Sequence, residues 1–412
     1  LRTREGPPRL KAVCDLTREE GHPISRLVRP RDETGPNPSR VKGISRVEPE
    51  LCPHSRFNKG GTTEFSPSLA FSGTNREARG RSFFISNLRS NQRGREVGNT
   101  MALITKAPRG TQDFTPDQSA RMRYIEDTLM RIAGLHGFGE IRTPTFEHTE
   151  LFVRSVGDTT DVVQKEMYTF EDKKGRSITL KPEGTAGAVR AALERGLLAE
   201  ALPLKLSYIT PCFRYEKAQA GRYREFHQFG VELLGAQSSA ADAEVIGLVQ
   251  EALDTLGVTE IRLFINSIGC PNCRPKFQQA LKDYYSAHYD ELCPTCQDRL
   301  ERNPLRILDC KEEHCHELAE HAPIVLDYLC DECREHFEEL QERLRAMGIA
   351  FEVDPTIVRG LDYYTKTVFE FKTETIGAQG TVCGGGRYDG LVELMGGQKQ
   401  PAVGFGMGLE RL

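Results

Sequence analysis

The segment 204–235 constrains the fold of this chain more than any other. It reads LKLSYITPCFRYEKAQAGRYREFHQFGVELLG, two apolar runs joined by a polar, basic loop, and this pattern predicts a β-hairpin. Because strand side chains alternate, one face of the second run is mostly core material: His227, Phe229, Val231 and Leu233. The other face combines a ring, an amide, a glycine and a carboxylate: Phe226, Gln228, Gly230 and Glu232. Arg214 and the loop cations Lys217, Arg222 and Arg224 suit a phosphate, whereas a surface hairpin with a wet outer face is the alternative.

The whole chain has 412 residues, which is too long for one ordinary domain. It contains neither a run of about 18 apolar residues nor an apolar signal-peptide core, so we expect a cytoplasmic protein without a membrane span. Net charge is −4, so any nucleic acid must be bound by local basic patches. Twelve cysteines without a secretory signal indicate reduced thiols or metal ligands.

Residues 1–100 differ from the rest of the chain. They are rich in Arg, Pro, Gly and Ser and lack apolar periodicity, so we expect a disordered basic leader. Ordered patterning begins near Met101, and we interpret the leader as not native. A basic arm that contacts RNA is the alternative, and the intact mass of the native protein would decide.

The first ordered part, 101–267, alternates helices and strands. Ile125, Leu129, Ile132 and His136 form one helical stripe, whereas 140–152 is a predicted strand interrupted by Pro144. Residues 166–183 predict a hairpin. Glu183 precedes the next helix and suits its dipole, and Thr185 either caps that helix or contacts a substrate. A second helical stripe and a strand over 261–266 follow; the stripe comprises Val245, Leu248, Val249, Ala252 and Leu256.

Residues 268–348 hold eight of the twelve cysteines in a predicted helical module inserted between strands. Three C-x-x-C pairs and a fourth pair beside His314 and His316 fit one or two structural Zn²⁺ sites, with reduced cysteines as the alternative. The candidate ligands are Cys270, Cys273, Cys293, Cys296, Cys310, Cys315, Cys330 and Cys333. A helical stripe near the end of this region comprises Phe337, Leu340, Leu344 and Met347.

The last part, 349–412, returns to strand patterning. Polar and aromatic residues lie between two apolar runs at 359–364, and the glycines at 384–386 allow close backbone approach. Gly-punctuated 402–408 predicts a strand that leads into a helix near Arg411, and we expect that the sequence is truncated there.

Taken in order, these segments resemble the three motifs of class II aminoacyl-tRNA synthetases, most closely those of bacterial histidyl-tRNA synthetases. Residues 138–152 resemble motif 1, residues 208–235 motif 2 and residues 404–412 motif 3. VRGLDYYTKT and GTVCGGGRYDGL resemble the histidine-specific signatures. The resemblance implies an α+β fold, an antiparallel sheet flanked by helices with the inserted Cys-rich module, and a homodimer. It also implies an anticodon-binding domain, which does not follow motif 3 in this sequence.

The resemblance further implies that ATP and L-histidine form histidyl-adenylate, which then esterifies the 3′ end of tRNA(His), with Mg²⁺ accompanying ATP. Arg214, Arg359 and Arg411 would be catalytic: Arg214 on the α-phosphate, Arg411 on the γ-phosphate, and Arg359 opposite Arg214 and on the substrate carboxylate. Phe226 would stack on adenine. Glu232, Gln228 and Thr185 would bind the α-ammonium group of histidine, and Glu183, Tyr363 and Tyr364 would surround its imidazole.

Gln219 and Arg222 would contact the tRNA acceptor end, with solvated loop residues as the alternative. Two other protein classes remain as alternatives. One is the synthetase-like regulatory subunit of ATP phosphoribosyltransferase, which is expected to lack RGLDYY and the catalytic arginines. The other is a zinc-stabilised RNA-binding module whose sheet is only a scaffold.

Overall fold

The computed structural model describes residues 105–412 except 158–159, 218–220, 311, 358 and 375–379. The chain divides into two compact units, 1–95 and 96–412, and all described residues belong to the second. The expectations for the leader and for Gln219 therefore lie outside the described residues. None of the described helices combines the length and apolarity that crossing a bilayer requires.

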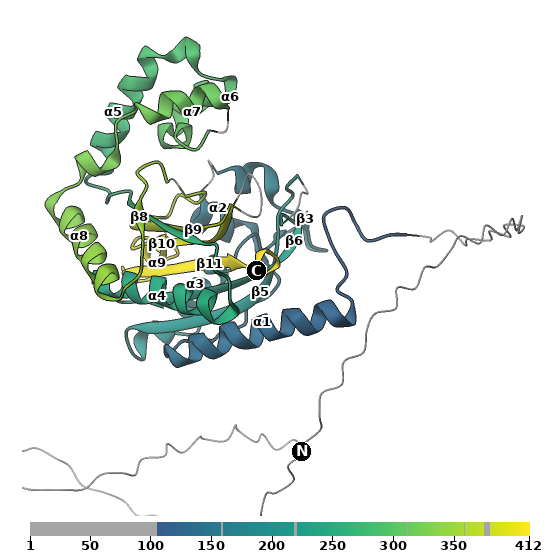
Figure 1. Cartoon of the computed structure of the whole chain (residues 1–412). Helices are drawn as coiled ribbons and strands as arrows, with labels where there is room; N and C mark the ends of the chain where they lie inside the picture. The colour runs from purple at the N-terminus through teal and green to yellow at the C-terminus, as the bar shows by residue number, and fades with distance from the viewer. Residues whose placement is uncertain (1–104, 158–159, 218–220, 311, 358, 375–379) are drawn as a thin grey trace, which may run out of the picture. The chain divides into compact units, whose positions relative to one another are not determined.

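An eight-stranded sheet forms the centre of this unit, in the order β1-β5-β6-β11-β10-β9-β7-β8 (Figure 1). The six inner strands pair antiparallel, and the short edge strands β1 and β8 pair parallel to their neighbours. The predicted mainly antiparallel α+β fold is thus confirmed. The strands are β1 Gly139–Glu140, β5 Leu204–Phe213, β6 Glu225–Leu234, β11 Ala402–Gly408, β10 Thr381–Arg387, β9 Thr365–Lys372, β7 Arg262–Ser267 and β8 Glu352–Val353.

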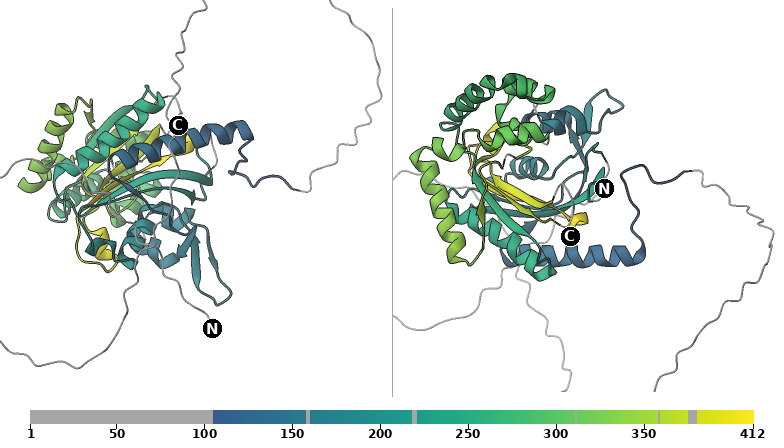
Figure 2. Two further views of the ribbon diagram at one scale, coloured as in Figure 1. Left: turned by 90° about the horizontal axis from the view of Figure 1, so that it is seen from below. Right: turned by 45° about the horizontal axis from the view of Figure 1, so that its top comes forward.

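One face of the sheet packs against long helices (Figures 1 and 2). These helices are α1 Pro116–Leu135, α4 Ser239–Leu256 and α8 Asp331–Ala346. The predicted stripes of α1 and α4 lie in this core except for His136, which follows α1 and contacts Glu251 at 2.9 Å. Phe229, Val231 and Leu233 from the apolar face of β6 also lie in this core. Met347 follows the end of α8 and is half exposed, so only the first three residues of its predicted stripe are buried.

A second sheet has the order β2-β4-β3 and contains the predicted hairpin. Its strands are β2 Phe146–His148, β4 Ser177–Leu180 and β3 Thr169–Glu171. The expected strand over 140–152 is wrong in its last part, because residues after His148 form helix α2 Thr149–Val156. Phe152 and Val156 are four residues apart, so they share one face of this helix, and both are buried. Tertiary packing therefore selects the helix over the strand.

The opposite face of the main sheet carries shorter elements, including α3 Thr185–Glu194 and α9 Leu391–Leu394. Apolar residues alternate with glycines along β11, and this alternation explains why the strand leaves space on the opposite face. Val403, Phe405 and Met407 enter the helix-covered core, whereas Gly404, Gly406 and Gly408 occupy the alternate positions. Short helical turns complete the chain: η1 Val162–Glu166, η2 Leu197–Ala199, η3 Tyr289–Glu291, η4 Pro304–Ile307, η5 Val325–Tyr328 and η6 Leu409–Arg411.

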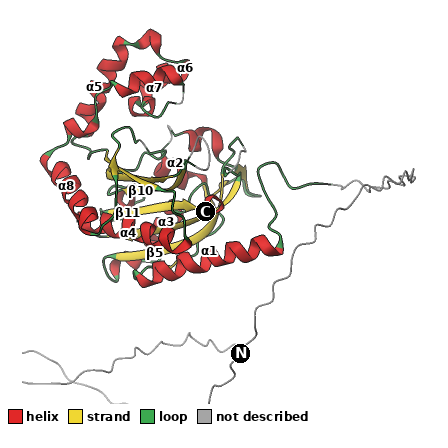
Figure 3. Ribbon diagram, in the orientation of Figure 1, coloured by secondary structure: helices red, strands yellow, loops and turns green. Residues whose placement is uncertain are grey.

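The cysteine-rich segment has a hydrophobic core of its own, which confirms a helical module between β7 and β8 (Figure 3). It contains α5 Arg274–Ala287, α6 Pro294–Arg302 and α7 Glu313–Glu320. The following helix α8 begins beside this module and packs its remaining length on the main core.

Candidate active site

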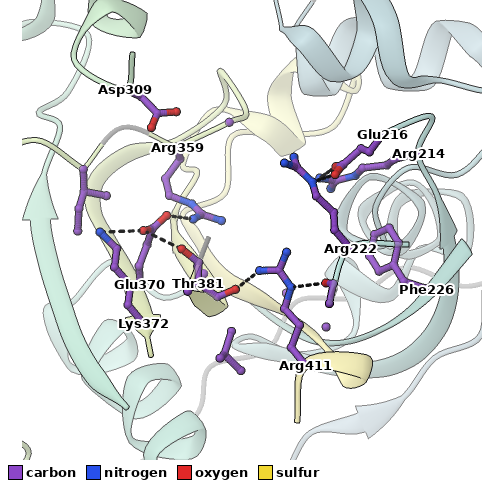
Figure 4. A pocket seen from close by; sticks show the side chains of 18 of the residues that line it. Arg214, Glu216, Arg222, Phe226, Asp309, Arg359, Glu370, Lys372, Thr381 and Arg411 are labelled. Atoms are coloured by element: carbon purple, nitrogen blue, oxygen red, sulfur yellow. Dashed lines mark hydrogen bonds and ion pairs between the residues drawn. The ribbon is translucent and has the colours of Figure 1, made fainter. Parts of the chain in front are cut away.

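Three arginines from distant parts of the sequence line one cleft of about 800 Å³ on the glycine side of the sheet. Arg214 follows β5, Arg359 precedes β9, and Arg411 lies in the turn after β11. Figure 4 shows Arg359 on one wall, Arg214 and Arg222 on the facing wall, and Arg411 between them. Such a cleft offers positive charge from several directions to one bound anion.

Glycines make room for these side chains. A Cβ on Gly384 would stand 2.4 Å from the Arg359 guanidinium, and one on Gly406 would stand 2.3 Å from the amide of Gln228. Gly408 also lines the cleft. The glycine triplet thus permits a close approach, and the group that approaches Gly384 is a protein cation. A close approach of a ligand to these glycines stays a prediction.

The motif 2 hairpin places two cations and one anion in the cleft. Arg222 forms an ion pair with Glu216, and Arg214 lies 4.0 Å from the same carboxylate. The Arg214 guanidinium also donates to the Pro182 carbonyl at 2.8 Å and lies 5.6 Å from the centre of the Phe226 ring. Arg222 is thus part of the cleft wall and is not a freely solvated loop residue.

Arg411 is held by backbone carbonyls. Its guanidinium donates to Gly221 O at 3.0 Å and to Thr381 O. Burial lowers the pKa of Arg411, and the nearby positive charges of Arg222 and Arg214 lower it further. This repulsion among cations favours a polyanionic ligand.

Arg359 pairs with Glu370, which lies on the cleft side of β9 and also lies 3.2 Å from the Lys372 ammonium. Burial lowers the pKa of Arg359, but the charge and hydrogen bond of Glu370 together with those of Tyr364 outweigh that effect, and the net shift is upward. The guanidinium therefore stays charged, and a bound anion would compete with Glu370 for it.

Glu232 lies deeper, beside the cleft and not on its wall. It is fully buried, and its carboxylate accepts hydrogen bonds from Tyr208 Oη at 2.8 Å and from Tyr388 Oη. Burial raises the pKa of Glu232 to about 8, although the two tyrosine hydrogen bonds oppose the shift. Bringing a cation to this carboxylate would favour its charged form.

Glu183 holds the start of α3. Its carboxylate accepts from the backbone N–H groups of Thr185 and Ala186, both at 2.8 Å, and burial raises its pKa. The predicted suitability of an anion at this helix start is confirmed. The capping interpretation of Thr185 is wrong, because Thr185 is the first helical residue and Gly184 is the cap.

Two contacts connect the buried residues around Glu183 and Glu232 to the wall of the cleft. Gln228 lines the cleft, and its side-chain oxygen accepts from Gly184 N at 2.9 Å. The Arg359 guanidinium lies 5.8 Å from the centre of the Tyr364 ring. The predicted histidine-contacting residues outside the cleft wall are Glu183, Thr185, Glu232, Tyr363 and Tyr364, and all five are buried together on this side of the sheet.

Sequence reasoning missed several partners of these residues. Tyr208 and Tyr388 flank Glu232, and Glu370 pairs with Arg359. The signal for Glu370 was present in VFEFK, where an acid alternates with core phenylalanines of β9. Tyr388 lies within the quoted signature GTVCGGGRYDGL.

The eight cysteines of the module form two groups of four. One group is Cys270, Cys273, Cys330 and Cys333, and the other is Cys293, Cys296, Cys310 and Cys315. Neither flanking histidine joins them: His314 lies 3.9 Å from Glu291 and 3.8 Å from Glu317, and His316 lines the cleft.

A mainly antiparallel sheet with helices on one face and arginines from three separate motifs on the other is the catalytic fold of a class II aminoacyl-tRNA synthetase. A profile described as histidyl-tRNA synthetase matches residues 110–412. The histidine–tRNA ligase of Caldanaerobacter subterraneus subsp. tengcongensis is 60% identical over 310 residues, 75% of this chain and 74% of that protein.

Solved structures agree. The apo histidyl-tRNA synthetase of S. aureus is 40% identical, with a TM-score of 0.61 over 75% of this chain and 72% of that one. A Bacillus halodurans protein described as an ATP phosphoribosyltransferase regulatory subunit/histidyl-tRNA synthetase is 26% identical, with a TM-score of 0.56 over 75% and 82%. The chain belongs to the histidyl-tRNA synthetase family.

Proposed function

We propose that this protein is a histidine–tRNA ligase that activates L-histidine with ATP and transfers it to the 3′ end of tRNA(His). The observation that carries the proposal is the convergence of Arg214, Arg359 and Arg411 on one cleft beside a buried carboxylate. Two anions, a carboxylate and a triphosphate, must meet in the first step, and such a cluster of cations lowers the cost.

In that step a carboxylate oxygen of histidine attacks the α-phosphorus of ATP, the bond to the β-phosphate oxygen breaks, and pyrophosphate leaves. Arg214 and Arg359 would hold the α-phosphate from facing walls, and Arg411 would bind the γ-phosphate of a bent ATP. Phe226 would stack on adenine. In the second step a ribose hydroxyl of the terminal adenosine attacks the acyl carbon, and AMP leaves.

The buried group beside the cleft would select histidine. Glu232 would pair with the α-ammonium group, assisted by Gln228 and Thr185, while Glu183 and Tyr364 would bond the two imidazole nitrogens next to Tyr363. A different side chain would leave these buried groups unpaired, which supports discrimination of about 10⁴ without editing.

Mg²⁺ would arrive with ATP and neutralise phosphate charge. Carboxylates at the cleft wall fit such an ion, because Mg²⁺ is usually bound by one or two carboxylates together with substrate phosphates. The described carboxylates that line the cleft, and are the candidates to hold it, are Glu216, Asp309, Glu313, Glu370 and Glu410.

Further parts of the proposal concern partners and organisation. Arg222 and Gln219 would contact the tRNA acceptor end, motif 1 would form a homodimer, and the protein would act in the cytoplasm. The catalytic domain would comprise 101–267 and 349–412, with 268–348 as the inserted module.

Histidine-dependent exchange of labelled pyrophosphate into ATP tests the proposal. We expect exchange with L-histidine and, with each of the other nineteen amino acids, at least about 10³-fold less. Absence of exchange in folded protein would favour the regulatory-subunit or RNA-binding alternatives. The regulatory-subunit alternative is disfavoured by the intact RGLDYY segment and by the three arginines in the cleft.

A further inference from the structure

We propose that the module holds two separate tetrahedral Zn²⁺ sites, each with four cysteine thiolates, and that these metals fix the module's wall of the cleft. The first site, called the neck site, comprises Cys270, Cys273, Cys330 and Cys333. The second, called the wall site, comprises Cys293, Cys296, Cys310 and Cys315. The sequence alone left open whether the cysteines form one zinc site, two zinc sites or a set of reduced thiols.

The neck site joins the two ends of the module. Cys270 and Cys273 precede α5, whereas Cys330 and Cys333 begin α8 about sixty residues later. Its four sulfur atoms lie within 4.8 Å of one another, with Cys270 Sγ 3.6 Å from Cys273 Sγ and 3.9 Å from Cys330 Sγ. A zinc ion at about 2.3 Å from four sulfurs needs sulfur separations of about 3.8 Å, so the thiols stand at the spacing of a ZnS₄ tetrahedron.

The wall site repeats this arrangement at the start of α6. Cys293 Sγ lies 3.9 Å from Cys310 Sγ, and all four sulfurs again lie within 4.8 Å. Each site also has a backbone amide directed at one sulfur: Cys330 N donates to Cys273 Sγ at 3.1 Å, and Cys293 N donates to Cys315 Sγ at 3.3 Å. Such donors stabilise thiolate charge around a bound metal.

Disulfides do not explain these tetrads. All ten cysteines that the structure describes are free thiols, and the quoted sulfur pairs lie far beyond the 2.05 Å of a disulfide bond. Four thiols converging in each of two places favour a soft, tetrahedral metal, and Zn²⁺ is the common one with all-cysteine ligands.

Both sites are tied to the segment 359–364. From the neck site, the Arg274 guanidinium next to Cys273 donates to Tyr364 O. Beside the wall site, Arg306 donates to Gly360 O at 2.7 Å and lies 3.8 Å from the Asp362 carboxylate. Cys310 itself lines the cleft, with its neighbour Asp309.

The module is small, and six of the 17 buried residues of its core are cysteines. Metal binding therefore supplies folding free energy that this core lacks. It follows that loss of the metals loosens one wall of the cleft and the backbone that carries Arg359 and Tyr364.

Metal content of the full chain, purified without chelator from cells supplied with zinc, tests the sites. We expect two zinc ions per chain, and exchange with Co²⁺ should give the intense sulfur-to-cobalt absorption of tetrahedral thiolate sites. Fewer than one zinc per chain, with all thiols titrating rapidly in the folded protein, would overturn the inference. This readout needs no enzymatic activity, so it can fail or succeed independently of the proposed function.

Variants separate the two sites. Cys333→Ser and Cys296→Ser should each lower zinc from two per chain to one, and the double variant should hold none. Cys212→Ser is the matched control, since Cys212 is a buried thiol outside both tetrads, and it should keep two. One metal that both single variants abolish would show a shared site and contradict the assignment.

The effect on the cleft rests on the proposed function. If the wall site positions 359–364, Cys296→Ser should weaken histidine affinity at least about tenfold while leaving the zinc of the neck site in place. Unchanged histidine affinity in a protein with one zinc would refute the positioning role and leave both metal sites standing.

Discussion

The Arg359–Glu370 pair is the most informative contact at the scale of single residues. Glu370 forms an ion pair with the guanidinium to which a phosphate would bind. A charge-assisted contact of this kind contributes about 1.5–3 kcal/mol, and more when charge builds in a transition state. The pair therefore makes Arg359 available only to a ligand that outcompetes a carboxylate.

We expect Arg359→Ala to slow single-turnover adenylate formation about 10- to 150-fold while weakening histidine binding far less. Arg262→Ala is the control, because Arg262 pairs with Glu352 at an exposed position of the same sheet. The double variant Arg359→Ala, Glu370→Gln removes the orphaned carboxylate and should remain slow. Equal losses of rate and affinity in Arg359→Ala would contradict the assigned role.

Glu232 predicts a proton-linked affinity for histidine. Its pKa of about 8 leaves it mostly protonated at pH 7, whereas pairing with an ammonium group requires the carboxylate. Calorimetry in two buffers of different ionisation enthalpy should show about one proton released per histidine bound at pH 7. Affinity should rise as pH increases from 6.5 to 8.

Imidazolepropionate, which lacks the α-amino group, should release no proton from this site and is the matched ligand. Heats for histidine that are the same in both buffers would show that Glu232 does not exchange its proton for the ammonium group.

Much of the residue-level account was accessible from the sequence. Alternation along 226–233 separated a core face from a second face, and the structure confirms the core face at Phe229, Val231 and Leu233. Phe226 and Gln228 of the second face line the cleft, and their contact with a ligand stays a prediction. Alternation could not predict how deeply each side chain of that face is buried. Gln228 reaches the cleft while Glu232 on the same face is sealed by two tyrosines, because Tyr208 comes from the neighbouring strand and Tyr388 from a distant loop.

At the scale of elements, the open side of the sheet depends on where glycines fall in β10 and β11. Because Gly384 has no side chain, it leaves space that the Arg359 guanidinium fills. This guanidinium is the end of a long, flexible side chain. A methyl group there would displace the guanidinium at little cost in stability.

Gly384→Ala should therefore reduce histidine-dependent pyrophosphate exchange at least about tenfold, with a melting temperature close to that of the unaltered protein. Gly390→Ala is the control, because nothing lies within 4 Å of a Cβ at Gly390 and its φ is negative. A Gly384→Ala protein with full activity would show that Arg359 tolerates the shift and is not positioned by this contact.

Helix and strand assignments failed where tertiary packing overrode local pattern. Residues 149–152 continue a strand-like sequence, yet they begin α2 because Phe152 and Val156 find a core on one helical face. At α3, the capping interpretation of Thr185 failed because Thr185 is the first helical residue, and the preceding Glu183 accepts hydrogen bonds from the first backbone amides.

At the scale of the whole molecule, the chain brings together groups that are separated by up to about two hundred residues. The spacing in the sequence shows that these cysteines come in pairs, but only the fold shows that the first pair lies beside the fourth and the second beside the third. Likewise, the motifs named the arginines individually, whereas their convergence on one cleft needed the strand order β5-β6-β11-β10-β9.

The most direct test of that convergence is a crystal structure of the full chain with a non-hydrolysable histidyl-adenylate analogue. We predict that the analogue's phosphate mimic lies between Arg214 and Arg359, its adenine stacks on Phe226, and its ammonium group lies against Glu232. An analogue bound elsewhere, or bound in this cleft with Glu232 still sealed by Tyr208 and Tyr388, would contradict the account.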